Sequence, residues 1–180
     1  MLFQNYGLFW HADRITWGSR GKGNEGKLLG FQTKTDGPAD FRYQRGVYAL
    51  YDESFRILYV GQAGYGNKRL YDRLDNHMSD HLGERWKRFS WFGIDPVQGS
   101  PKKLRLVEKE PSAPRVNDVL NHLEAILIAA AEPSLNRQGG KFGKAQQFYQ
   151  WWEKEEEEIQ TELHAIKETI GTIAAKVARL

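Results

Sequence analysis

Two short runs of mostly apolar residues in the first half of the chain predict β-strands. In residues 47–51, Val, Ala and Tyr alternate with Tyr and Leu, and residues 56–61 are again rich in apolar and β-branched residues. Because β-branched and aromatic residues favour strands, and the polar turn at residues 52–54 separates the runs, they predict an antiparallel hairpin. Further strands are expected at residues 88–93 and 103–107.

Apolar residues at helical spacing predict two helices after the hairpin. One begins near Asn67, and Leu70 and Leu74 give it an apolar stripe. The second runs from Asn117, which can cap its N-terminus, to about Ala131. The residues expected on its buried face are Leu120, Leu123, Leu127 and Ala130.

A heptad pattern predicts one long amphipathic helix at the C-terminus, over residues 145–178. Its apolar seam advances alternately by four and three residues through Ile159, Leu163, Ile166, Ile170, Ile173, Val177 and Leu180. Such a seam needs an apolar partner, which can be another copy of the chain, a different protein or its own domain. We favour self-association as a homo-oligomer, although isoleucine at both kinds of seam position does not select a dimer.

These elements together predict an α+β fold, in which helices flank a small antiparallel sheet of three or four strands. Residues 45–140 would form the folded domain. Residues 1–44 show no regular pattern and are expected to be an irregular N-terminal extension. Residues 145–180 would be a coiled-coil helix outside the domain.

The composition is that of a folded protein. The chain has 180 residues, 40% of them hydrophobic, and no run of about 18 apolar residues that would suggest a membrane span. It has no cysteine, which excludes disulfides and cysteine nucleophiles, and its N-terminus lacks the pattern of a signal peptide. We therefore expect a cytoplasmic protein that does not bind membranes.

Charge is distributed unevenly along the chain. The net charge is +3, and residues 151–180 contain seven Glu against four Lys or Arg, so that residues 1–150 carry a net +6. A basic body permits a polyanion such as DNA as partner. Within residues 17–27, a glycine-rich basic stretch, Arg20 and Lys22 are candidates for a DNA-contacting arm, although a surface loop explains the same composition.

Two tyrosine triplets fall on the strands of the predicted hairpin. They are Gly46-Val47-Tyr48 and Tyr59-Val60-Gly61, and the next helix carries Arg73 four residues before His77. The second helix then carries Glu124 beside its apolar stripe, and Asn136 follows that helix. These five features are the two triplets, the helix with Arg73 and His77, Glu124 and Asn136. Their order over residues 45–138 resembles that of the GIY-YIG nuclease family, with one conservative change in each triplet.

This resemblance implies an endonuclease that hydrolyses DNA phosphodiester bonds with one Mg²⁺ ion, which Mn²⁺ can replace. The reaction requires an activated water, and cations or protons that stabilise the charge on phosphate and leaving oxygen. The implied roles are Tyr48 as general base or as the residue that orients the water, and Tyr59 as a contact to the phosphate or the water. His77 would contact phosphate or assist proton transfer, and Arg73 would stabilise transition-state charge. Glu124 would be the metal ligand, and Asn136 would position Glu124 or a phosphate.

The position of the arginine has an alternative. The segment after Gly61 is longer than in the commonest form of the family, and counting forward from it points to Arg69 instead of Arg73. We prefer Arg73, because a glycine-rich loop absorbs insertions more easily than a helix. Lys68 and Arg69 then become candidate nucleic-acid contacts.

Two other functions fit the sequence. The same fold can serve as a non-catalytic module that binds nucleic acid, and the heptad helix can serve an oligomerising scaffold. If the chain is a nuclease, restriction or phage defence is one role for it, but no residue pattern identifies a target sequence.

Overall fold

The computed structural model has an α+β fold. It describes residues 2–19, 25–108, 110, 113, 115–132, 138–153, 158–159, 161–164, 166–167 and 170. Three candidate site residues from the sequence, Arg20, Lys22 and Asn136, lie outside the described residues. In the C-terminal seam, Ile173, Val177 and Leu180 also lie outside them.

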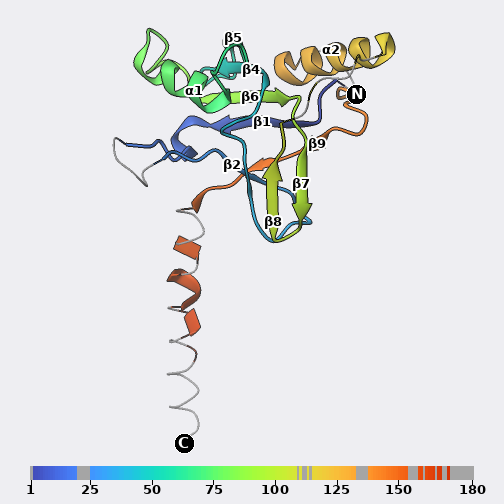
Figure 1. The fold of residues 1–180 in the computed structure, drawn as a ribbon. Coiled ribbons are helices and arrows are strands. Elements are labelled where there is room, and N and C mark those ends of the chain that lie inside the picture. Colours follow the sequence, from blue (N-terminus) through green and yellow to red (C-terminus); the bar gives the residue numbers. More distant parts are fainter. Residues whose placement is uncertain are drawn as a thin grey trace, which may run out of the picture.

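The centre of the fold is a five-stranded sheet with the strand order β5-β4-β6-β1-β9. Its strands are β1 (Asn5–His11), β4 (Gly46–Tyr51), β5 (Ile57–Ala63), β6 (Arg88–Gly93) and β9 (Gln146–Gln147) (Figure 1). Neighbours are antiparallel except for β1 and β9, which pair in parallel. The predicted β4–β5 hairpin and the strand at residues 88–93 are confirmed, but the sheet is larger than expected and mixed.

The expectation that residues 1–44 are irregular is wrong. They contain β1, the short 3₁₀ helix η1 (Ala12–Arg14), β2 (Leu29–Phe31) and β3 (Ala39–Asp40), and β1 lies inside the main sheet. Two features hide the alternation of apolar and polar residues that would have predicted β1. Gly7 interrupts it, because a Cβ there would lie only 2.4 Å from Trp91 Nε1. The pairing of β1 with β6 is also irregular after Gly7. Gly7 has no side chain because two tryptophan rings occupy that space.

The expectation of a helix from residue 145 is also wrong at its start. Residues there form β9 and then β10 (Tyr149–Gln150), which joins a three-stranded sheet of order β10-β2-β3. Phe148, between the two strands, is 1% exposed and packs against Phe41 in the core. Because this aromatic residue is buried, the segment stays extended against the body. The heptad pattern had predicted a helix at these residues. The described residues from 158 onward are helical, and their seam positions are exposed.

Two helices cover the two faces of the main sheet. On α1 (Leu70–Ser79), the predicted stripe of Leu70 and Leu74 is buried in the same core cluster as Tyr48. Helix α2 (Val116–Ala131) packs through Ala125 in a second cluster that includes Val47. Successive residues of a strand face opposite sides, so α1 and α2 lie on opposite faces of β4. In the described part of the chain, no helix is long and apolar enough to cross a membrane.

The buried face of α2 differs from the predicted one. Leu120, Leu123 and Leu127 are between 48% and 67% exposed, whereas His122 and Ala125 are buried. Gly140 passes so close to the helix that a Cβ on it would lie 2.5 Å from the Ala125 Cα. A small residue is needed at this contact, and the helix therefore turns its alanine inward and leaves the leucines uncovered.

The predicted strand at residues 103–107 is confirmed in part. It is β8 (Lys103–Leu106), and it pairs only with β7 (Val97–Ser100) in a separate two-stranded sheet. This β7–β8 hairpin extends away from the main sheet (Figure 1).

Candidate active site

The register of the β4–β5 hairpin places Tyr48 and Tyr59 on one face of the sheet. Gly61 lies directly opposite Tyr48, and the ring centroids of the two tyrosines are 6.1 Å apart. A Cβ on Gly61 would lie 2.5 Å from Cζ of Tyr48 and 2.7 Å from Cε1 of Tyr59. The glycine therefore lets the Tyr48 ring lie across β5, close to Tyr59.

Helix α1 brings Arg73 and His77 onto the tyrosine pair. The Tyr48 hydroxyl lies 2.8 Å from His77 Nε2, and Arg73 Nη2 lies 3.4 Å from the Tyr59 hydroxyl. Arg73 is also hydrogen-bonded to Tyr48. Residues four apart in a helix project from the same side, so one helix turn supplies both the cation and the imidazole. Four of the residues predicted from the sequence thus meet in one cluster.

Asp80 completes this cluster and was missed by the sequence analysis. Its Oδ2 lies 2.6 Å from His77 Nδ1, and its Oδ1 accepts the Leu82 N–H at 2.7 Å. Burial raises the pKa of Asp80, but the hydrogen bonds from Leu82 and His77 outweigh it and hold that pKa below its ordinary value. The carboxylate is therefore ionised at neutral pH and accepts a hydrogen bond from Nδ1–H, and in that neutral tautomer His77 Nε2 faces the Tyr48 O–H as an acceptor.

Tyr48 does not exist as a phenolate in the free protein at neutral pH. Burial raises its pKa above the ordinary value near 10, and the neighbouring Arg73 offsets this only in part. The side chain is 1% exposed. Tyr59 and Arg73 are half-buried and form the solvent side of the cluster. A phosphate would therefore reach Arg73 and Tyr59 first.

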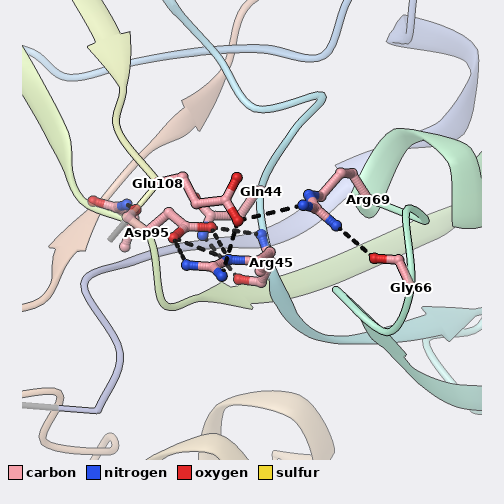
Figure 2. A network of polar contacts seen from close by, with 7 residues as sticks. Gln44, Arg45, Gly66, Arg69, Asp95 and Glu108 are labelled. Carbon is pink, nitrogen blue, oxygen red and sulfur yellow. Dashed lines mark hydrogen bonds and ion pairs between the residues drawn. The ribbon is translucent and has the colours of Figure 1, made fainter. Parts of the chain in front are cut away.

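Arg73 differs from Arg69 in its partners. In the described part of the chain, Arg73 makes no ion pair with a carboxylate, and its Nε has no hydrogen-bond partner. Arg69 instead pairs with Glu108 at 3.3 Å and donates to the Gly66 carbonyl (Figure 2). The charge of Arg73 is therefore free to meet a phosphate, and the geometry favours Arg73 over Arg69 at the tyrosines.

The structure does not bring Glu124 into contact with the tyrosine cluster. Glu124 is exposed on α2, and Lys68 is exposed just before α1. Among the described residues there is no group of three His, Asp or Glu side chains that could hold a metal ion. A single carboxylate nevertheless suits Mg²⁺, which keeps several waters and takes oxygen ligands from phosphate. The donor chemistry of Glu124 thus suits magnesium, but its position on α2, across β4 from the tyrosines, does not place it beside a phosphate bound by Arg73.

No family model, curated protein or solved structure matches this chain. The function therefore has to be argued from the cluster of Tyr48, Tyr59, Arg73, His77 and Asp80.

Asp80→Asn should lower the rate of the nuclease reaction that the resemblance implies by about tenfold or more. Asparagine keeps the shape of the side chain but lacks the negative charge that would stabilise an imidazolium formed on His77 when it takes a proton from Tyr48. The amide oxygen of Asn can still accept the Leu82 N–H, which preserves the fold. Rates measured between pH 5 and 9 check this, with Asp75→Asn on the exposed side of α1 as control. An unchanged rate would mean that Asp80 only ends the helix.

Proposed function

We propose that the protein is a metal-dependent endonuclease that hydrolyses phosphodiester bonds of DNA. One observation carries this proposal: Arg73 points at two tyrosine hydroxyls and has no carboxylate partner in the described structure, while His77 and Asp80 lie behind Tyr48. A cation without an anion, beside a chain of proton-transferring groups, suits an anionic substrate from which a proton must be removed.

The phosphate would be held by Arg73 and Tyr59. The hydrogen bond from Arg73 to Tyr59 is long, at 3.4 Å, and bonds from a guanidinium to phosphate oxygens are shorter and stronger. The arginine can therefore exchange this contact for a bound phosphate. When it does so, it stabilises the charge that grows on the phosphorus oxygens in the transition state.

Movement of Arg73 toward phosphate also uncovers the Tyr48 hydroxyl. Water that then contacts Tyr48 can pass its proton to the tyrosine oxygen as the tyrosine proton moves to His77 Nε2, 2.8 Å away. Asp80 stabilises the imidazolium that forms. This path explains how a tyrosine with a raised pKa can act as general base near neutral pH.

The resemblance implies Glu124 as the residue that would hold Mg²⁺, but Glu124 lies on α2, on the opposite face of β4 from Tyr48 and Arg73. A metal ion bound together with the substrate would supply positive charge to the phosphate and the leaving oxygen. Asn136, which the sequence places after α2, would position Glu124 or a phosphate.

A cleavage assay tests the proposal directly. Plasmid, linear duplex and single-stranded DNA are incubated with the full chain in Mg²⁺, Mn²⁺ or EDTA. We expect cutting in either metal and none in EDTA. Glu124→Gln tests the metal ligand that the resemblance implies: a loss of about 100-fold or more would assign the metal to Glu124, whereas wild-type cutting would agree with its position across the sheet. Glu132→Gln, at the end of the same helix, is the matched control. Cutting in EDTA would contradict metal dependence, and no cutting of any substrate would contradict the nuclease proposal.

An oligomerising scaffold is the second candidate. It is supported by the exposed leucines of α2 and by the exposed seam residues Ile159, Leu163, Ile166 and Ile170. Exposed apolar patches commonly mark protein interfaces. A mass in solution equal to one chain over a wide concentration range would contradict this candidate. A multiple of that mass, without any cleavage, would favour it over the nuclease.

A further inference from the structure

The β7–β8 hairpin has one apolar and one polar face. Val97, Leu104 and Leu106 pack against the main core cluster. On the other face Gln98 lies opposite Arg105 and Ser100 lies opposite Lys103, and all four of these side chains are exposed. Successive side chains of a strand point to opposite faces. The apolar side chains therefore attach the inner face of the hairpin to the body, and the amide, hydroxyl and cationic groups point outward.

The outward face of the hairpin carries positive charge and no negative charge. Residues 97–106 include Lys102, Lys103 and Arg105 and no acidic residue. In the part of the chain that the structure describes, none of these cations forms an ion pair. The neighbouring β2–β3 loop meets the hairpin tip where the Asp36 N–H donates to the Pro101 carbonyl, and it adds one lysine, Lys34, against that one aspartate. The hairpin therefore keeps a net positive charge without local neutralisation.

An ion-pair network fixes the base of the hairpin to the helix of the active site. Asp95, which precedes β7 and is fully buried, binds the Arg45 guanidinium at 2.6 Å. Glu108, which follows β8, lies 3.0 Å from Arg45 and 3.3 Å from Arg69 at the start of α1 (Figure 2). The hairpin is thereby held in a set orientation relative to α1, which carries Arg73 and His77.

We infer that the β7–β8 hairpin is a DNA-binding ribbon that enters the major groove and contacts the flanking phosphates through Lys102, Lys103 and Arg105. This inference rests on the proposed nuclease function, which supplies DNA as the polyanion. The major groove of B-DNA is about 12 Å wide and admits a two-stranded ribbon, whereas the groove of duplex RNA is too narrow. Gln98 and Ser100, on the same face, are side chains that can hydrogen-bond base edges. An acidic protein is the alternative partner for a basic surface, but its binding would not require a ribbon that fits the major groove or amide groups that can contact bases.

The salt dependence of DNA binding tests the ribbon. Binding of the full chain to a short labelled DNA duplex is measured by fluorescence anisotropy in EDTA, between about 50 and 200 mM salt. In Lys103→Gln/Arg105→Gln, the slope of log Kd against log salt should fall by about 1.8, because each lost phosphate contact removes about 0.9. Near 0.1 M salt this corresponds to binding weaker by about 10- to 60-fold. The changed side chains are exposed, so the leucines still anchor the hairpin.

Lys141→Gln/Lys144→Gln is the matched control, because it removes the same charge from two exposed lysines elsewhere. It should keep most of the wild-type slope. Equal slopes for the two double variants would overturn the ribbon, and so would an equal loss of binding to duplex RNA. If the hairpin variant binds DNA like wild type while metal-dependent cleavage remains, the ribbon fails and the nuclease stands. If wild type binds no duplex DNA, the ribbon fails, and the nuclease is then decided by the cleavage assay, which includes single-stranded DNA.

Discussion

Arg73→Ala should reduce the rate of DNA cleavage by about 10³-fold or more. Removal of a single group that stabilises charge in the transition state costs about 10²–10³ in rate, and an arginine on a reacting phosphate costs up to about 10⁵. Arg73 lies at the tyrosine hydroxyls without a carboxylate partner in the described residues, so nothing else in the cluster supplies that charge. Single-turnover cleavage at saturating protein measures the loss.

Arg69→Ala is the control for Arg73, because it removes the same side chain one helical turn earlier. Arg69 is tied to Glu108, and its loss should weaken DNA binding or stability more than the chemical step. Arg73→Lys keeps the charge but loses the fork geometry that matches phosphate, and it should recover only part of the rate. If Arg69→Ala abolishes cleavage and Arg73→Ala does not, the active site lies one turn earlier than we place it.

Tyr48→Phe should reduce cleavage by about 10²- to 10⁴-fold, the usual contribution of a general base. The substitution removes only the hydroxyl that lies 2.8 Å from His77 Nε2, and the phenylalanine ring fills the same buried space. Thermal stability and DNA binding should therefore stay close to wild type while the rate falls. Rates over a range of pH measure the effect.

Tyr51→Phe tests whether loss of any buried hydroxyl on β4 has this effect. Tyr51 is also fully buried, but it follows Leu50 on the other face of the strand, away from the tyrosine cluster. It should cleave at the wild-type rate. Wild-type cleavage by Tyr48→Phe would mean that water is activated without Tyr48, and the proposed path through His77 and Asp80 would be wrong.

The parts of the fold that could be predicted from the sequence depend on local signals. Strands β4 and β5 have β-forming residues on both sides of a polar turn, and α1 has its apolar residues one turn apart. These three elements also carry Tyr48, Tyr59, Arg73 and His77. The resemblance in sequence therefore covered the part of the candidate site whose geometry is set by local structure.

The elements that sequence patterns missed are determined by contacts between distant residues. The place of β1 depends on Trp91, more than 80 residues later, which leaves no room for a side chain at Gly7. The turning of α2 depends on Gly140, which no apolar stripe reveals. Asp80 escaped notice because an aspartate at a helix end is common, and only the 2.6 Å contact to His77 shows its second role.

The position of β1 in the sheet has a consequence for synthesis on the ribosome. The β4–β5 hairpin and α1 need only residues 46–79 and can form as soon as these leave the exit tunnel, since local contacts form fastest. Strand β1 leaves first but waits for β6, and its other edge stays open until residues 146–147 arrive. An unpaired strand edge invites pairing with other chains. A nascent chain that pauses before residue 146 would thus be most prone to aggregate at its own N-terminus.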